Sequence, residues 1–310
     1  MNAPKNKNCS IRFFSAALIA VLALLPVSLT NAQLIDGNFD NLPIGTAPDD
    51  DMAAGAWHFP QHYIDFDPAQ SELTNTTMFT IVATDPIGEG GEGNSLSLDS
   101  DVFDIVFLPN IFNSIVTTDL IFRLETYVPT EGGNATFIVG GDHGGGGWAF
   151  ETDRGPQVTC FADGTIVSAS QEGEPIVVGQ FEFDRWLQFE LHISLEDNNY
   201  DLYYGPRGEN IDLIASDLNF RTPSLLSFID RVTIAYFGEI PFLGAAHQYF
   251  DNFELIILGD VNQDGELNLL DVGPFVEVIS SGDYQVEADV NKDGNVDLLD
   301  VARFVELLSS

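Results

Sequence analysis

Two segments near the C-terminal end of the chain carry oxygen-bearing side chains at the same spacing. The first is Asp260-Val-Asn-Gln-Asp-Gly-Glu-Leu-Asn-Leu-Leu-Asp271, and it recurs 29 residues later as Asp289-Val-Asn-Lys-Asp-Gly-Asn-Val-Asp-Leu-Leu-Asp300. In each copy Asp or Asn stands at positions 1, 3, 5, 9 and 12, and glycine stands at position 6. This pattern is typical of a twelve-residue calcium loop, because Ca²⁺ takes six to eight oxygen ligands and the glycine permits a sharp turn.

Each copy predicts a full set of ligands, so we expect two bound Ca²⁺ ions. The predicted ligands of the first loop are Asp260, Asn262, Asp264, the Glu266 carbonyl, Asn268 (through water) and Asp271. Those of the second loop are Asp289, Asn291, Asp293, the Asn295 carbonyl, Asp297 and Asp300. Asp/Asn-rich turns without metal are the alternative, and the identical phase of two full matches argues against it. The apolar residue at position 8, Leu267 or Val296, is expected in a short strand that pairs the loops.

The residues around the loops differ from those of an ordinary EF-hand, in which a helix precedes each loop and position 12 is glutamate. Here an apolar run, 253–258, leads into the first loop through Gly259 and predicts a strand. Helices are expected only after the loops, beginning around Leu269 and Leu298, with Gly273-Pro274 interrupting the first.

Duplicated loop-plus-exit-helix units of this kind resemble the type I dockerin domain over the whole of 260–310. The two copies also share Leu-Leu-Asp-Val and Phe-Val-Glu, which predicts approximate two-fold symmetry. The resemblance implies a calcium-dependent fold that binds cohesin domains on scaffolds. Known dockerins often tether polysaccharide-degrading enzymes or binding modules.

Loop positions 10 and 11 depart from the dockerin pattern, because many cellulosomal dockerins carry polar or hydroxyl-bearing residues there, where the cohesin is read. This chain carries leucine pairs, Leu269-Leu270 and Leu298-Leu299. We interpret the four leucines as partner-binding candidates; the alternative is that they only pack the helix pair together. Since no flexible linker precedes Asp260, Leu269 or Leu270 is expected to pack on the preceding domain, leaving Leu298 and Leu299 free.

The preceding residues, 33–258, show short alternating apolar and polar runs separated by Gly, Asn, Asp and Pro, which predicts an all-β domain. The clearest run is 187–195, and Trp186 before it is expected to be buried. About a dozen such runs predict a two-sheet jelly roll or β-sandwich with aromatic-rich facing layers. The fold class is therefore mainly β, followed by a small α-helical module with paired calcium loops.

Parts of this domain resemble the concanavalin A-like lectin/glucanase sandwich, namely residues 93–98, the strand pair 186–204 and the closing run 250–255. The resemblance implies the fold. The superfamily includes lectins, carbohydrate-binding modules, laminarinase-type hydrolases, lyases and structural domains, so fold alone does not give function.

The sequence does not complete the catalytic patterns of those enzymes. A laminarinase-type site needs Glu-x-Asp-x-x-Glu, because retaining hydrolysis uses two carboxyl groups about 5 Å apart. Glu151-Thr-Asp153 supplies the first two acids, but Pro156 stands where the second glutamate belongs. A lyase needs clustered Arg, His and Tyr or Lys, and only Arg123-Leu-Glu125 hints at one. The sequence therefore predicts no catalytic residue.

Carbohydrate binding has two aromatic candidates, because sugar rings stack on aromatic faces. Trp57 lies in the aromatic run 57–63, and Trp148 follows four glycines, 144–147. The alternative is that each tryptophan plugs an end of the sandwich, as tryptophans are highly buried on average.

The first 32 residues predict a signal peptide, with a basic start, an apolar run over 13–25 and cleavage after Ala32. The apolar run is shorter than the roughly 20 residues of a membrane span, and an uncleaved anchor is the alternative. Cleavage leaves eight basic and 48 acidic residues, a net charge of −40, with Cys160 as the one cysteine. Such a charge disfavours nucleic acid and anionic lipid and attracts cations.

These observations predict three segments: a signal peptide (1–32), a concanavalin A-like jelly roll (33–258) and a dockerin-like calcium module (259–310). The expected product is a secreted or cell-surface, non-catalytic protein that binds polysaccharide or a surface partner and docks to a cohesin-like domain. The alternatives are a divergent glycoside hydrolase or polysaccharide lyase, and a purely structural surface protein.

Overall fold

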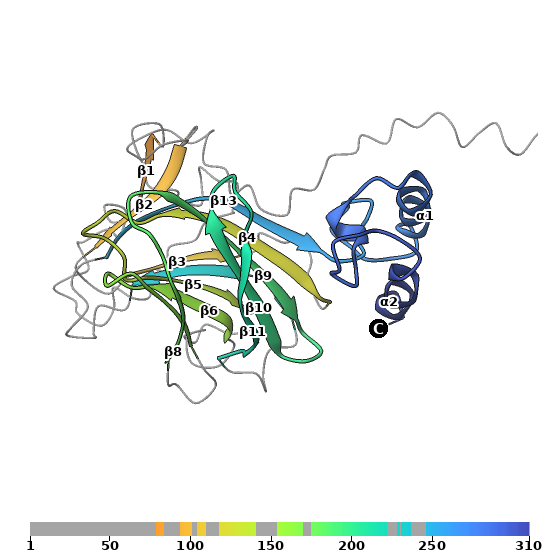
Figure 1. Ribbon diagram of the computed structural model, residues 1–310, viewed down its shortest axis with the longest axis horizontal. Coiled ribbons are helices and arrows are strands. Elements are labelled where there is room, and N and C mark those ends of the chain that lie inside the picture. The colour runs from red at the N-terminus through yellow and green to blue at the C-terminus, as the bar shows by residue number, and fades with distance from the viewer. Residues whose placement is uncertain are drawn as a thin grey trace, which may run out of the picture. The chain divides into compact units, whose positions relative to one another are not determined.

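The computed structural model describes residues 79–83, 94–100, 104–109, 118–140, 154–169, 175–221, 228–229, 231–236 and 246–309. Two antiparallel sheets form the larger part (Figure 1). The seven-stranded sheet has the order β1 (Phe79–Ala83), β2 (Asn94–Ser100), β13 (Ala246–Ile257), β4 (Leu120–Tyr127), β9 (Trp186–Ser194), β10 (Asn199–Pro206) and β11 (Asp212–Asn219). The six-stranded sheet has the order β3 (Asp104–Pro109), β12 (Arg231–Tyr236), β5 (Ala135–Gly140), β6 (Arg154–Cys160), β7 (Thr165–Ala169) and β8 (Pro175–Gln180).

The predicted two-sheet, mainly β fold is therefore confirmed. In strands such as β4, β5, β9 and β10, alternate residues face the other sheet and contribute to one apolar core. Aromatic rings connect the two layers: the Phe137 ring of β5 lies 6.5 Å from Phe122 of β4 and 5.5 Å from Phe189 of β9. Cys160 is free and buried in this core, and burial raises the pKa of its thiol to about 12.

The outer face of the seven-stranded sheet carries the other residues of the same strands. Trp186 is buried, as predicted, but it packs on this outer face, with its ring 5.8 Å from Tyr127 and 5.7 Å from the Arg207 guanidinium. The alternation that buries Leu187 and Phe189 between the sheets places Trp186 and Gln188 on the opposite side.

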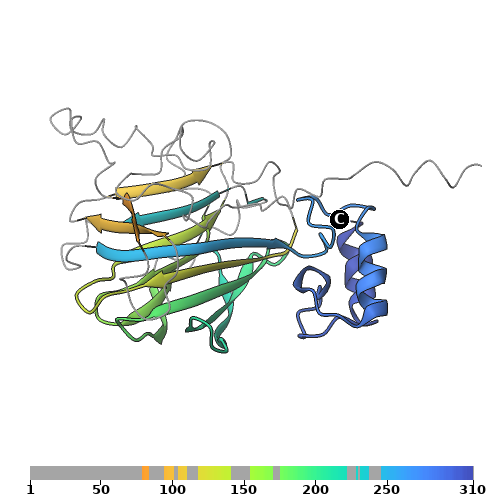
Figure 2. The same ribbon diagram turned by 90° about the horizontal axis from the view of Figure 1, so that it is seen from above.

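Strand β13 leads directly into the C-terminal module (Figure 2). Its last residues pair with β4, and Gly259 follows with φ +93°, a conformation that L side chains rarely adopt. The Gly259 N–H donates to the Glu287 carbonyl at 2.7 Å, so the first residue after the strand is already bonded inside the module. The predicted strand-to-loop connection is confirmed.

The module contains α1 (Val272–Ser281), a 3₁₀ turn (Val286–Ala288) and α2 (Asp300–Leu307), so each loop is followed by an α-helix. The helices begin two or three residues later than predicted, because Leu269 and Leu298 lie in the turn that ends each loop. Pro274 does not interrupt α1. It stands in the first turn, where a helix does not need the missing N–H.

The two exit helices pack through equivalent phenylalanines. The rings of Phe275 and Phe304 stack with centroids 3.9 Å apart and planes 9° apart, and both side chains are buried. These are the phenylalanines of the repeated Phe-Val-Glu, so the predicted symmetry has a physical contact at its centre. The predicted strand at position 8 is absent from the described module; Leu267 and Val296 instead pack against the module's apolar cluster.

No helix among these described ranges is long and apolar enough to cross a membrane. The predicted signal peptide lies outside the described residues, as do Trp57, Trp148 and the acids Glu151 and Asp153.

Candidate functional site

The first aspartate of each loop organises the loop backbone. In the first copy, the N–H groups of Asp264 and Gly265 donate to the two carboxylate oxygens of Asp260 at 3.1 and 2.8 Å. In the second copy the equivalent bonds to Asp289 measure 3.1 and 2.9 Å. Both oxygens of the position 1 carboxylate are therefore held in place, and their remaining lone pairs are available to a cation.

The last aspartate closes each loop in the same manner. Asp271 accepts from the N–H groups of Asn262 and Asn268 at 3.0 and 2.8 Å. Asp300 accepts the two equivalent bonds at 3.1 and 2.9 Å. Positions 3, 9 and 12 are thereby tied together in both copies, so the predicted ligands from the two ends of each loop lie next to one another.

Backbone conformation repeats as closely as the hydrogen bonds. Position 6 has φ +91° at Gly265 and +84° at Gly294, which confirms the predicted sharp turn. Position 4 also lies in the left-handed region, with φ +57° at Gln263 and +61° at Lys292. The sequence pattern singled out position 6 because it requires glycine, and gave no signal for position 4.

Four buried carboxylates lie in these loops. Their exposed fractions are 3% for Asp260, 0% for Asp271, 4% for Asp289 and 0% for Asp300. Within the described ranges none of them pairs with a Lys, Arg or His. Burial raises the pKa of Asp260 to about 6, and the charge of Asp271 acts in the same direction. Burial also raises the pKa of Asp271 and of Asp289.

Buried, unpaired carboxylates of like charge are costly unless a cation compensates them. The residues present fit Ca²⁺, a hard cation that prefers carboxylate, amide and carbonyl oxygens. Within the described part of the chain, no group of three or more His, Cys, Asp or Glu side chains is placed to hold a metal ion. Each loop would therefore combine its carboxylates with Asn and carbonyl oxygens, as the predicted ligand sets do.

Calcium affinity at the first loop should fall by about tenfold between pH 7 and pH 5, because protonation of Asp260 near pH 6 competes with the ion. The sign follows from the raised pKa: in the metal-free chain the shift favours folding below about pH 4 and that benefit is lost as the pH rises through about 6. Calcium titrations at the two pH values measure the change. Equal affinities at pH 7 and pH 5 would contradict the assignment of Asp260 as a ligand.

The leucine pairs at positions 10 and 11 form two exposed surfaces, which we name the first leucine face (Leu269 and Leu270) and the second leucine face (Leu298 and Leu299). Their exposed fractions are 80% and 68% in the first face and 77% and 68% in the second. The expectation that Leu269 or Leu270 packs on the sandwich is wrong. The interpretation that the leucines pack the helix pair is also wrong, because Phe275 and Phe304 do so.

Other residues of the module contact the sandwich instead: Leu267 of the first loop packs against the sandwich core, and the second half adds an ion pair. Arg303 of α2 donates from Nη2 to Asp119 Oδ2, just before β4, at 2.9 Å. Behind this ion pair, Ile121 and Ile256 of the sheet belong to the same apolar cluster as Val290. Both leucine faces therefore stay accessible while the joint is held by other residues.

Replacing Arg303 with alanine should loosen this joint, since Asp119 is largely buried and would lose its charged partner, an interaction of about 1–3 kcal/mol. Small-angle scattering of the calcium-loaded chain should fit one domain arrangement in the wild type and a broader ensemble in Arg303→Ala. Arg185→Ala is the matched control, because Arg185 pairs with two exposed acids within the sandwich. A broad ensemble already present in the wild type would contradict a fixed joint.

A polar cluster lies on the outer face of the seven-stranded sheet. Arg123 of β4 contacts Glu190 of β9 and, at 3.1 Å, Glu254 of β13, while His192 Nε2 contacts the other oxygen of Glu190. Burial raises the pKa of Glu190, but the His192 hydrogen bond and the Arg123 charge outweigh it, so that the pKa lies below its usual value. Glu190 is thus held as a carboxylate.

A second ion pair lies on the same face, between Arg207 and Glu125 at 2.9 Å, and Asn252 also donates to Glu125 at 2.8 Å. The sequence hinted at Arg123 and Glu125 but missed Glu190, His192 and Arg207. The alternation of apolar and polar residues within each strand placed these side chains on the polar face of the sheet. Only the register, which sets Arg123 opposite Glu190, brings them together.

Comparison with known proteins gives one family match: residues 258–309 match the family model of the dockerin type I domain. No curated protein matches the chain. Among solved structures, the chain is similar to the catalytic domain of the glycoside hydrolase family 131 protein from Coprinopsis cinerea, with 12% identity and a TM-score of 0.43 over 72% of this chain and 93% of that one.

It is also similar to a sialidase (13% identity, TM-score 0.40, 69% of this chain and 20% of that one) and to the VIP36 exoplasmic/lumenal domain in its Ca²⁺/Man3GlcNAc-bound form (8%, 0.37, 58% and 84%). The chain thus spans about a fifth of the sialidase. Identities of 8 to 13% assign the sandwich to no family. The match at 258–309 confirms the dockerin resemblance predicted for 260–310, and dockerin domains bind calcium.

Proposed function

With a dockerin type I domain at its C-terminal end, we propose that this chain is an exported, non-catalytic binding protein of a polysaccharide-degrading or cell-surface assembly. Its module, 259–310, would bind two Ca²⁺ ions and dock to a cohesin-like partner, and its jelly roll, 33–258, would bind an extracellular glycan or surface partner. The signal peptide, 1–32, would be removed on export.

The observation that carries the docking role is the exposure of the two leucine faces on a module whose buried carboxylates call for cations. Large apolar side chains this exposed, on a rigid turn beside a calcium loop, mark a surface for a protein partner. Leucines at positions 10 and 11 require an apolar patch on that partner, because a polar patch would be desolvated without compensation. A cohesin-like domain with such a patch is the partner we propose.

Binding of a glycan without turnover agrees with the charges on the sheet face. Glu190 and Glu125 each pair with an arginine, and the lowered pKa of Glu190 makes it a poor proton donor near neutral pH. The large negative charge also argues against a nucleic-acid or anionic-lipid partner.

Hydrolysis or lyase chemistry is the second candidate, favoured by the gathering of three carboxylates, two arginines and a histidine on one sheet face. Its test is Glu190→Gln. If the chain releases reducing or unsaturated sugars from polysaccharide and Glu190→Gln abolishes the release, the chain is an enzyme and the non-catalytic proposal fails.

A capture experiment tests the proposed function as a whole. The full chain is immobilised, exposed to the native secretome in calcium and then washed with chelator, and the same chain is applied to a glycan array. We expect a cohesin-like protein that elutes with chelator, and glycan binding without sugar release. Docking without any glycan binding would indicate a purely structural surface protein. Failure to capture a partner would overturn the docking role.

A further inference from the structure

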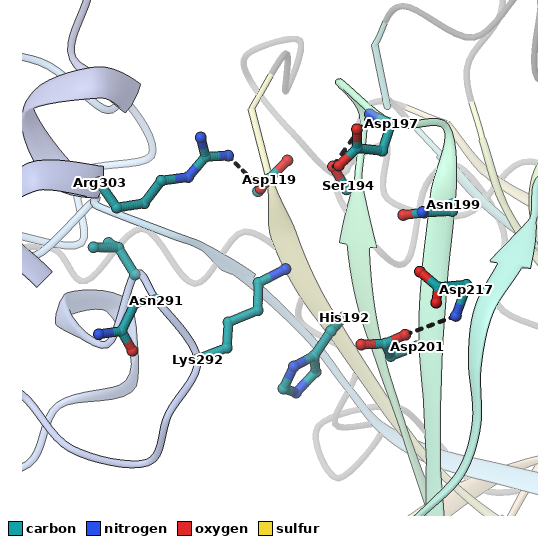
Figure 3. Close-up of a pocket in the computed structure, with 11 residues that line it drawn as sticks. Asp119, His192, Ser194, Asp197, Asn199, Asp201, Asp217, Asn291, Lys292 and Arg303 are labelled. Atoms are coloured by element: carbon teal, nitrogen blue, oxygen red, sulfur yellow. Dashed lines mark hydrogen bonds and ion pairs between the residues drawn. The ribbon is translucent and has the colours of Figure 1, made fainter. Parts of the chain in front are cut away.

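A pocket of about 360 Å³ lies where the second calcium loop meets the sandwich (Figure 3). Its sandwich wall includes His192 of β9, Asp201 of β10 and Asp217 of β11. Its module wall includes Asn291 and Lys292, positions 3 and 4 of the second loop. Neither part has this pocket by itself.

The joint described above gives the pocket a defined shape. The ion pair of Arg303 with Asp119 closes one side, and the apolar cluster that contains Ile121 and Val290 lies behind it. The sandwich wall is also internally fixed, because the Asp217 N–H donates to Asp201 Oδ1 at 2.9 Å. Such a preformed pocket loses little conformational entropy when a ligand binds.

The lining excludes several ligand classes. Every lining residue except Val290 is polar or charged, which disfavours a wholly apolar molecule. Its carboxylates, including Asp197, Asp201 and Asp217, outnumber its cationic groups, which disfavours phosphate, sulfate and uronate. A metal ion is disfavoured too, because the Lys292 side chain extends from the loop toward the strands that carry His192 and Asp201 (Figure 3).

The remaining class is a neutral molecule rich in hydroxyl groups. Each sugar hydroxyl both donates and accepts, so it can bond a carboxylate on the sandwich wall and an ammonium or amide on the module wall. Lys292 forms no ion pair with the described residues, which leaves its donors free for this role. The volume is that of a small ligand site and matches one or two sugar rings.

We propose that this joint pocket binds a short neutral saccharide, with Asp201 and Lys292 as opposing hydrogen-bond partners. The inference rests on the proposed glycan binding and adds a location and a ligand class. Because Asn291 and Lys292 belong to the second calcium loop, the pocket requires that loop to be folded. Saccharide binding is therefore calcium-dependent and, by linkage, saccharide raises the affinity of the second loop for calcium.

The test is calorimetry of the full calcium-loaded chain with neutral disaccharides (cellobiose, laminaribiose, mannobiose and xylobiose) and with digalacturonate as the charged comparison. We expect binding of at least one neutral disaccharide and no binding of digalacturonate. Lys292→Ala and Asp201→Asn should each weaken binding at least tenfold. Gln263→Ala is the matched control, because Gln263 occupies position 4 of the first loop with the same positive φ and lies away from the pocket.

The outcomes separate this inference from the proposed function. If a disaccharide binds wild type, Lys292→Ala and Asp201→Asn equally, the assignment of the saccharide to this pocket is wrong. The glycan then binds elsewhere on the sandwich. If wild type binds none of the neutral disaccharides, or prefers digalacturonate, the pocket is wrong while partner capture still tests docking. Unchanged calcium stoichiometry in Lys292→Ala shows that the variant loop is folded.

Discussion

Chelating calcium should abolish hydrogen-exchange protection from Gly259 to the C-terminal residues while β4 and β9 remain protected. Without cations, four buried carboxylates of like charge stand in a module of about 50 residues, and the apolar cluster that it shares with Ile121 and Ile256 of the sheet is too small to compensate for them. The sandwich has its own core between the two sheets and contains no predicted calcium ligand. Exchange followed by mass spectrometry, with and without chelator, measures the difference region by region.

A pair of substitutions provides the control for this result. Asp300→Ala removes a fully buried carboxylate of the second loop and should lose protection in α2 even in calcium. Asp283→Ala removes an exposed acid from the same module and should behave as the wild type. Equal loss of protection across residues 120–206 on chelation would mean that the sandwich and the module unfold as one unit.

Partner binding should tolerate the loss of one leucine face and fail when both are lost. Replacing Leu298 and Leu299 with serine leaves the first leucine face intact, so affinity should fall only about twofold, as one of two equivalent orientations is removed. Replacing all four leucines should weaken binding at least about 100-fold, since burying each leucine contributes about 1.5–3 kcal/mol. The measurement is surface binding to the captured cohesin-like partner.

The leucines are exposed, so the four-leucine variant should keep the fold and the calcium stoichiometry of the wild type. Leu213→Ser is the matched control, because Leu213 is a half-exposed leucine on β11 of the sandwich. Loss of binding after changes to a single face would show that only that face docks. Full binding by the four-leucine variant would show that the partner is recognised elsewhere.

The conformation of the two predicted calcium loops could be predicted from the sequence because it is set locally. The positive φ of Gly265 and Gly294 agrees with the requirement for glycine at position 6. The symmetry was predictable for the same reason, since a repeated Phe-Val-Glu places Phe275 and Phe304 equivalently.

The packing of the module could not be predicted in the same way. Leu267, Leu269 and Leu270 stand close together in the first loop, yet only Leu267 packs against the sandwich core, while Leu269 and Leu270 lie exposed on the turn that ends the loop. The ion pair of the joint is made by Arg303, which meets Asp119 from 184 residues away. Hydrophobicity alone gave no signal for that ion pair.

The polar face of the sheet needed the strand register as well. Arg123 lies on β4, Glu190 and His192 lie on β9 and Glu254 lies on β13, and the strand order β13-β4-β9 determines that they meet. Alternation predicted which side of each strand they occupy, but not which strands are neighbours.

A calorimetric titration of the full chain with Ca²⁺ tests the two-loop assignment most directly. We predict two ions, with the second loop binding more tightly, because it offers four carboxylates (Asp289, Asp293, Asp297, Asp300) against three in the first (Asp260, Asp264, Asp271). Asp297→Asn should bring the affinity of the second site toward that of the first. A stoichiometry of one ion or none would contradict the calcium-dependent module on which the docking role depends.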